Sequence, residues 1–276
     1  MPELPEVQTL VDDLNDAKVC GAVIKSARVF WPKTIADMAP YAFCHLIAGK
    51  QVTAIYRRAK YIIFDLTGGW HLLVHLRMSG HFHIASPDLP RTKHQHVILE
   101  LNDLRQLRFT DPRKFGRFFM VSDVFPILSR LGPEPLDKKF TAHLLGLCLL
   151  TRRRMLKPLL LDQTVIAGLG NIYTDEALWQ ARLHPHALGS ELSMSQIRSL
   201  HRAIRKVLRL GLHNKGTTLG RGQTTFYSLG ERQGRNRNHL KVFRRTGLPC
   251  LRCRTPIERL VVGQRSTHIC PQCQTV

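Results

Sequence analysis

The sequence predicts an α+β protein with several domains: an N-terminal helix and a β-sandwich, then a helical domain that ends in a cysteine-rich module. Three observations support this prediction. Short apolar or alternating runs fill the region from about residue 22 to 122, which is typical of a sandwich or barrel. Helical periodicity follows residue 142. Four of the seven cysteines lie after residue 249.

The first segment shows helical spacing of apolar residues, and two prolines near its start are compatible with a first turn. Its apolar positions are Leu4, Val7, Leu10, Val11 and Leu14. Candidate strands follow at residues 52–56, 61–66, 71–76, 96–101 and 116–121, separated by turn signals such as Thr67-Gly68-Gly69. A helix followed by short strands indicates an N-terminal domain in which the helix packs on a sheet.

The second half has helical periodicity. Its clearest helix begins near Ser193, where Gln196 completes a capping box. One face of this helix is apolar, and its basic residues fall mostly elsewhere. The chain is loop-like from Gly211 to Gly247. The predicted division is residues 1–131 for the sandwich domain, 132–142 for a stiff linker, 143–240 for the helical domain and 241–276 for the cysteine module.

Charge is the unusual feature of the composition. Lys and Arg total 41 against 20 Asp and Glu, a net charge of +21. Residues 131–276 hold 24 of the basic and 8 of the acidic residues. A basic field of this size favours a polyanionic partner, most often nucleic acid. An anionic membrane surface, or charge that serves solubility alone, are the alternatives.

The sequence gives no sign of a membrane-spanning or secreted protein. No apolar stretch approaches the ~20 residues that cross a bilayer, and acidic residues in the first segment argue against a secretory signal. We therefore expect a cytoplasmic, nucleoid-associated protein whose thiols stay reduced. Cys20, Cys44 and Cys148 lie in apolar segments and are expected to be buried.

The cysteine-rich module has the spacing of a zinc site. Cys250, Cys253, Cys270 and Cys273 form two Cys-x-x-Cys pairs with sixteen residues between them. Each pair can supply two ligands from a tight turn to a single tetrahedral Zn²⁺ ion. Four thiolates then complete the coordination sphere and leave no position for a catalytic water. The prediction is one structural zinc ion. Two disulfides or a redox pair are the alternatives.

The N-terminus has the residue types of a Schiff-base nucleophile. Removal of Met1 would expose Pro2 as a secondary amine with a pKa near ~8, well below that of lysine. A secondary amine forms a cationic iminium with an aldehyde carbon without needing a proton. Glu3 is placed to act as a general acid and base, and Glu6 lies one helical turn away. The alternative is ordinary helix capping by proline and glutamate.

Several stretches, in order along nearly the whole chain, resemble the bacterial formamidopyrimidine-DNA glycosylase family. They are residues 2–7 (PELPEV), 57–61 (RRAKY), 75–80 (HLRMSG), 110–116 (TDPRKFG), 168–173 (GLGNIY) and the terminal zinc module. The resemblance implies a helix–two-turn–helix motif in the helical domain. It also implies a bifunctional enzyme that is both a DNA glycosylase and an AP lyase.

The resemblance further implies roles for single residues. Pro2 would attack C1′ of the damaged nucleotide, Glu3 would assist ring opening and proton transfers, and β- and δ-elimination would cut the strand. Lys60 would contact phosphate near the lesion and Arg265 would grip the backbone; both are grouped with the catalytic residues. The expected DNA-binding residues are Glu6, His75, Met78, His94, Arg113, Phe115 and Asn171, of which Met78, Arg113 and Phe115 form the wedge that replaces an extruded base.

The expected function is excision of oxidised purines, chiefly 8-oxoguanine and formamidopyrimidines, by a monomer acting on damaged double-stranded DNA without a small-molecule cofactor. One departure concerns residues 222–230 (GQTTFYSLG), where the family usually has an Asp-Gly-containing loop. This departure leaves the lesion preference open. An endonuclease VIII-like preference for oxidised pyrimidines is one alternative, against which Leu4 argues mildly. A non-catalytic zinc-dependent nucleic-acid-binding protein is the other.

Overall fold

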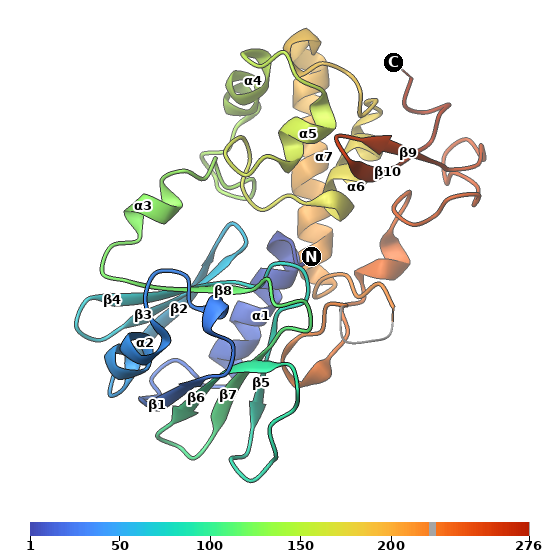
Figure 1. The fold of residues 1–276 in the computed structure, drawn as a ribbon. Helices are drawn as coiled ribbons and strands as arrows, with labels where there is room; N and C mark the ends of the chain where they lie inside the picture. The colour runs from blue at the N-terminus through green and yellow to red at the C-terminus, as the bar shows by residue number, and fades with distance from the viewer. Residues whose placement is uncertain (221–224, 276) are drawn as a thin grey trace. The chain divides into compact units, whose positions relative to one another are not determined.

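The alternating segments of the N-terminal half form two four-stranded antiparallel sheets (Figure 1). Strand order is β1-β6-β7-β5 in one sheet and β2-β3-β4-β8 in the other. The strands are β1 (Ile24–Val29), β2 (Val52–Arg58), β3 (Tyr61–Leu66), β4 (Trp70–His75), β5 (His81–Ala85), β6 (Gln95–Leu101), β7 (Gln106–Thr110) and β8 (Arg117–Val121). All five predicted strands are present, and the α+β fold class is confirmed.

This structure is a computed structural model that describes residues 1–220 and 225–275. The chain divides into two units. The first comprises Met1–Leu128 and Asn214–Arg235, and the second comprises Ser129–His213 and Asn236–Val276. The division differs from the expected one in two ways. Residues 214–235 belong to the N-terminal unit rather than the helical domain, and the cysteine module belongs to the helical unit.

An aromatic cluster fills the space between the two sheets. Phe64 and Phe118 come from one sheet, and Phe82 and Phe109 come from the other. The ring centroids of Phe109 and Phe118 are 4.9 Å apart, and those of Phe82 and Phe109 are 5.3 Å apart. Tilted and edge-on ring contacts add to the burial of apolar area, so this cluster holds the sandwich together.

Helix α1 (Leu4–Asp16) packs its apolar face against β2 and β3, as the first segment predicted. Hydrogen bonds and an ion pair join α1 to the described residues of segment 214–235. Glu6 accepts the N–H of Thr217, and Asp13 accepts the hydroxyl of Ser228 and pairs with Arg232. The unit also contains α2 (Pro40–Ile47), α3 (Phe125–Leu128) and short 3₁₀ turns at Pro32–Thr34 and Leu229–Glu231. The periodicity of the sequence did not predict α2.

The second unit is built around two helices, α6 (Asn171–Ala181) and α7 (Met194–His213). They approach so closely that a β-carbon at Gly211 would lie 2.5 Å from the Tyr173 ring. The predicted capping box at the start of α7 is present, because Ser193 and Gln196 exchange hydrogen bonds of 2.8 and 3.2 Å. The remaining elements are α4 (Ala142–Leu150), α5 (Leu156–Leu161), 3₁₀ turns at Gly189–Glu191 and Asn236–His239, β9 (Glu258–Val262) and β10 (Arg265–Ile269).

Residues 132–142, expected to be a stiff linker, form hydrogen bonds within this unit. Arg205 of α7 donates to the carbonyl oxygens of Pro135 and Asp137, and Gly132 donates to the carbonyl of Gln163. None of the described helices combines the length and apolar character that a membrane-spanning segment needs.

Replacing Phe118 by alanine tests the inter-sheet cluster. Phe118 is fully buried and contacts Phe82 and Phe109, so the cavity is expected to cost about 3–5 kcal/mol of unfolding free energy. Urea denaturation measures this change. The matched control is Tyr41→Ala, because that side chain is 80% exposed; equal losses for the two variants would contradict the proposed core.

Candidate active site and nucleic-acid interface

Pro2 lies just before the first helix and is buried. Helix α1 has Glu3 as its N-cap, so Pro5, and not Pro2, occupies the first-turn position that proline favours. Capping therefore explains Pro5 but leaves Pro2 without a role in the helix.

The Glu6 carboxylate holds the backbone next to Pro2. It is 1% exposed and accepts the N–H of Glu3 through Oε2 and the N–H of Thr217 through Oε1, each at 2.8 Å. A carboxylate in this position fixes the start of the chain and joins it to residues 214–235. The expected contact of Glu6 with DNA stays a prediction.

Charged groups of both signs surround the N-terminal amine. Burial lowers the pKa of the Met1 amino group, Glu3 and Glu6 raise it, and Lys60 and Arg113 lower it further. Lys60 is itself 4% exposed and follows Ala59, whose φ of 53° makes the tight turn between β2 and β3. The predicted nucleophile, its predicted acid–base partner and the predicted phosphate-contacting lysine are thus close in one unit.

His75 ends strand β4 beside this cluster. Its ring Nδ1 accepts the N–H of Arg77 at 3.0 Å, and Tyr61 packs on the ring at 4.8 Å between centroids. Burial and the positive charges of Arg77 and Lys60 lower the pKa of His75 to about 3. The imidazole is therefore neutral at physiological pH with its proton on Nε2, which suits donation to a phosphate oxygen.

The three predicted wedge residues lie on two loops of the same unit. Met78 is partly exposed on the loop between β4 and β5, and Arg113 and Phe115 are exposed on the loop between β7 and β8. The Arg113 guanidinium lies over the Phe115 ring, 5.0 Å from its centroid. His94 lies next to the second loop, because its carbonyl accepts the N–H of Asp111.

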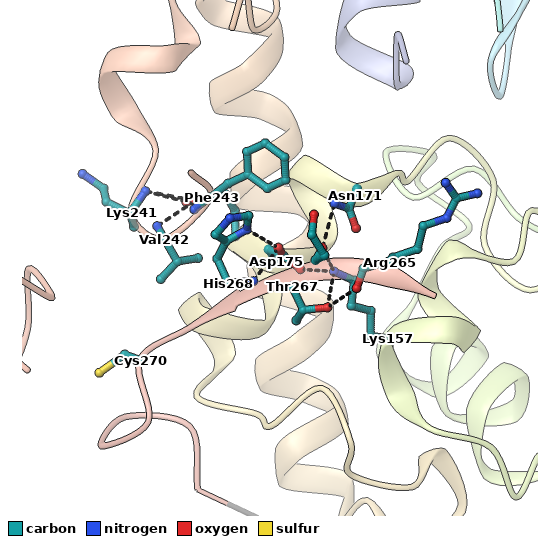
Figure 2. Close-up of polar contacts among 12 residues, drawn as sticks. Lys157, Asn171, Asp175, Lys241, Val242, Phe243, Arg265, Thr267, His268 and Cys270 are labelled. Atoms are coloured by element: carbon teal, nitrogen blue, oxygen red, sulfur yellow. Dashed lines mark hydrogen bonds and ion pairs between the residues drawn. The ribbon is translucent and has the colours of Figure 1, made fainter. Parts of the chain in front are cut away.

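In the second unit, Asn171 and Arg265 lie on neighbouring elements (Figure 2). Asn171 is the first residue of α6, and its Nδ2 donates to the carbonyl of Ser266 at 3.0 Å. Arg265 is the first residue of β10, and its side chain is exposed. The sequence prediction that these two residues contact phosphate is compatible with this placement, since a helix N-terminus and an arginine both attract anions.

A buried ion pair fixes β10 to α6 (Figure 2). Lys157 is completely buried; its Nζ lies 2.6 Å from Asp175 Oδ1 and donates to Ser266 O and Thr267 Oγ1 at 2.9 and 2.8 Å. Asp175 Oδ2 accepts the N–H of His268 at 2.9 Å. Lys157 therefore pairs with Asp175, whereas Asp162 pairs with Arg154 at 3.1 Å.

The next residue of α6, Glu176, holds the segment that leads into the cysteine module. Its buried carboxylate accepts the N–H groups of Lys241, Val242 and Phe243 at 2.9 to 3.0 Å. Burial raises the pKa of Glu176, and these three N–H groups lower it. The roles of Asp175 and Glu176 were not predicted from the sequence. The available signal was two adjacent acidic residues within the mostly apolar stretch of residues 171–181.

The four predicted zinc ligands converge. Their sulfur atoms all lie within 4.8 Å of one another, with Cys253–Cys270 at 3.3 Å and Cys250–Cys273 at 4.0 Å. A ZnS₄ tetrahedron with bonds of ~2.3 Å has edges of about 3.8 Å, whereas a disulfide needs ~2.05 Å. The donor set fits one structural zinc ion, which these four thiolates hold, and the module is a zinc finger.

Comparison with known proteins covers the whole chain. Three family models match the chain. The formamidopyrimidine-DNA glycosylase N-terminal domain matches residues 1–118, and the H2TH domain of the same glycosylase matches residues 131–222. A zinc finger found in FPG and IleRS matches residues 247–276. Formamidopyrimidine-DNA glycosylases of Protochlamydia amoebophila and Herpetosiphon aurantiacus are 47% and 45% identical, over 99% of this chain and 99% and 100% of theirs.

Solved structures agree. The complex between Lactococcus lactis Fpg and DNA containing an abasic site has a TM-score of 0.92 at 34% identity, covering 99% of this chain and 100% of that one. The MutM (Fpg) protein from Thermus thermophilus has a TM-score of 0.89 at 39% identity, covering 99% and 98%.

Replacing Cys270 by serine removes one of four zinc ligands. We expect loss of zinc and weaker DNA binding, because the metal stabilises the fold of the finger. Metal analysis and fluorescence anisotropy with a duplex measure the two effects. Cys148→Ser is the control, since that thiol lies outside the cluster; unchanged zinc content in Cys270→Ser would contradict the ligand assignment.

Replacing Lys157 by alanine leaves the buried Asp175 carboxylate without its cation. A loss of about 3–5 kcal/mol of unfolding free energy is expected, measured by urea denaturation. Arg154→Ala breaks the solvent-exposed pair with Asp162 and is expected to change stability little. Similar losses in the two variants would show that burial does not distinguish the two pairs.

Proposed function

The chain belongs to the formamidopyrimidine-DNA glycosylase family, and we propose that this DNA glycosylase excises oxidised purines from duplex DNA with Pro2 as its nucleophile. One observation supports the nucleophile most strongly. Pro2 is buried outside the helix, and Glu3, Glu6, Lys60 and Arg113 act on the amine of its neighbour Met1. Damaged DNA is the proposed partner, and we expect the enzyme at the nucleoid.

The proposed reaction requires removal of Met1. The Pro2 nitrogen then donates its electron pair to C1′ of the damaged nucleotide, and the bond from C1′ to the base breaks with its electrons on the base. The proton that the Pro2 nitrogen loses passes to the departing base. Opening of the sugar ring, with a proton supplied through Glu3, leaves a cationic iminium between Pro2 and C1′. Loss of a C2′ proton expels the 3′ phosphate, and a second elimination expels the 5′ phosphate.

The surrounding residues support this chemistry in distinct ways. Lys60 and the neutral His75 are proposed to hold the phosphates beside the lesion, and Asn171 and Arg265 to hold the backbone through the second unit. Met78, Arg113 and Phe115 are proposed to fill the stack that the extruded base leaves. His94 is proposed to contact DNA beside the Arg113 loop. The zinc ion is structural and takes no part in a step.

Borohydride trapping on an abasic-site duplex tests the nucleophile. The wild-type protein should form a covalent adduct, and Pro2→Gly should lower its yield strongly because a primary amine of different geometry replaces the ring nitrogen. Pro5→Ala is the matched control, since Pro5 belongs to the helical turn. Mass spectrometry of the adduct should place it on a chain that lacks Met1. Strand scission by a chain that retains Met1, or DNA binding without any adduct, would contradict the proposal; the second result fits a non-catalytic binding protein.

The pH dependence of lyase activity gives a second test. Burial first, and then the charges of Lys60 and Arg113, lower the pKa of the Met1 amine, whereas Glu3 and Glu6 raise it. We expect the same surroundings to lower the pKa of the Pro2 amine once Met1 is removed, so that more of it is neutral and reactive at a given pH. The acid limb of the single-turnover rate should therefore lie below the ordinary value of ~8. Lys60→Met should move this limb to higher pH, whereas Lys60→Arg should keep it. An acid limb that stays in place in both variants would contradict the proposed electrostatic effect.

Lesion preference is the remaining part of the proposal. Residues 222–224, the start of the departure from the family pattern, lie outside the described residues. Phe226 and Ser228, just after them, are buried in the N-terminal unit. Comparing excision of 8-oxoguanine and thymine glycol from matched duplexes decides between the purine and pyrimidine alternatives; faster removal of thymine glycol would overturn the purine assignment.

A further inference from the structure

Two adjacent crossover loops of the sandwich carry the three wedge residues. Residues 76–80 connect β4 to β5, and residues 111–116 connect β7 to β8. Since β4 pairs with β8 and β5 pairs with β7, both loops cross from one sheet to the other at the same end of the sandwich. The register places His75 opposite Arg117 and His81 opposite Thr110. The topology therefore brings the loops side by side.

The Asp111 carboxylate joins the two loops. Asp111 is 1% exposed, and its Oδ1 accepts the hydroxyl proton of Ser79 from the other loop. Its Oδ2 accepts the N–H of Gly116 at 2.6 Å. The backbone N–H of Arg113 donates to both Ser79 Oγ, at 3.2 Å, and Asp111 Oδ1, at 3.3 Å. A buried carboxylate with several donors is bound more tightly than a neutral acceptor.

No ion pair forms between the described side chains of Asp111 and Arg113. The guanidinium of Arg113 lies over the Phe115 ring instead. Asp111 thus holds the backbone of Arg113 while leaving its positive charge at the surface. Pairing with Asp111 therefore does not account for the presence of an arginine at position 113.

The Phe109 ring packs against a glycine of each loop. A β-carbon at Gly80 would lie 2.7 Å from Phe109 Cζ, and one at Gly116 would lie 2.4 Å from the same atom. Real β-carbons do not approach so closely, so glycine is required where each loop crosses the ring. Phe109 and Asp111, two residues apart on one strand end, therefore fix both loops in place.

The backbone beside the wedge residues is held in an uncommon conformation. Arg77, before Met78, has a φ of 55°, and Lys114, before Phe115, has a φ of 60°. Residues other than glycine adopt this region only where their surroundings enforce it. The hydrogen bonds of Asp111 and Ser79 provide this enforcement, because they fix the residues that follow Met78 and precede Lys114.

We propose that Asp111, through Ser79, is a positioning residue that makes the two loops one rigid carrier of the wedge. It contacts neither the sugar nor the base. Its effect is to present Met78, Arg113 and Phe115 in a fixed arrangement, so that no loop ordering has to accompany opening of the base stack. This inference rests on the proposed function, because it assigns the wedge its role in base extrusion.

The test compares Asp111→Asn and Ser79→Ala with the wild-type enzyme. Asparagine keeps the shape of the aspartate side chain but replaces one accepting oxygen by an NH₂ group. That group then faces the donor of either Ser79 or Gly116, and one of the two hydrogen bonds is lost. Ser79→Ala removes the link between the loops. The control is Asp103→Asn, in the turn between β6 and β7, where the carboxylate binds Arg105 at the surface.

Two readouts separate positioning from chemistry. The first is single-turnover excision from a paired duplex, with 2-aminopurine beside the lesion to report stack opening. The second is borohydride trapping on a single-stranded abasic oligonucleotide, in which no stack has to open. Asp111→Asn should slow excision and the fluorescence rise by about tenfold or more, and Ser79→Ala by a smaller factor. Trapping should stay within about twofold of wild type, and Asp103→Asn should behave as wild type throughout.

The outcomes are distinct. The inference would be overturned if both loop variants excised the lesion and opened the base stack at wild-type rates. It would also be overturned if the variants lost duplex excision and single-strand trapping to the same extent. If circular dichroism shows that Asp111→Asn does not fold, Ser79→Ala alone decides by the same criteria. Failure of the proposed function has a different signature: absence of any adduct with the wild-type enzyme, or an adduct that persists unchanged in Pro2→Gly.

Discussion

A carboxylate that leaves water must find hydrogen-bond donors. Among the described residues, Glu6, Asp111, Asp175 and Glu176 find backbone donors in the segments that carry or adjoin the proposed site residues. Glu6 accepts from Glu3 and Thr217, and Glu176 accepts from three consecutive residues before the zinc finger. Asp111 accepts from both ends of the second wedge loop, and Asp175 accepts from β10. The loops that carry the proposed site residues depend on these interactions for their shape.

This arrangement suits a chain with a net charge of +21. If exposed acidic side chains paired with Arg113 or Arg265, they would neutralise the positive charges that attract the DNA backbone. Acidic groups that are buried and satisfied mostly by N–H groups stabilise the loops without that cost. Among the described residues, Arg232 pairs with Asp13 in the first unit, and Lys157 neutralises Asp175 inside the second unit. Lys157 is itself completely buried, so this pair takes no cation from the surface.

The sequence predicted what periodicity and spacing encode. The apolar positions of α1, five strands, the capping box at Ser193 and the four zinc ligands all depend on residues close in the chain or on a fixed metal geometry. Helix α2 was missed because its eight residues, PYAFCHLI, have no polar face that would separate a helix from a buried strand.

The partners of buried charges could not be predicted, for a different physical reason. Lys157 and Asp175 are 18 residues apart, and Ser79 and Asp111 are 32 apart. The acidic pair at residues 175–176 in an apolar stretch indicates burial, but nothing local in the sequence indicates which residues become partners. Only the packing of α6 against β10, and of one crossover loop against the other, removes them from water and so selects their partners.

The placement of residues 214–235 follows from the same constraint. Composition alone made this segment a loop of the helical domain, because it follows α7 directly and is rich in Gly, Thr and Arg. Glu6 and Asp13, on the buried face of α1, lie one above the other at a spacing of two helical turns, and the segment supplies donors to both through Thr217 and Ser228. The helix that begins beside Pro2 is thereby bonded to this segment at Thr217 and at Ser228.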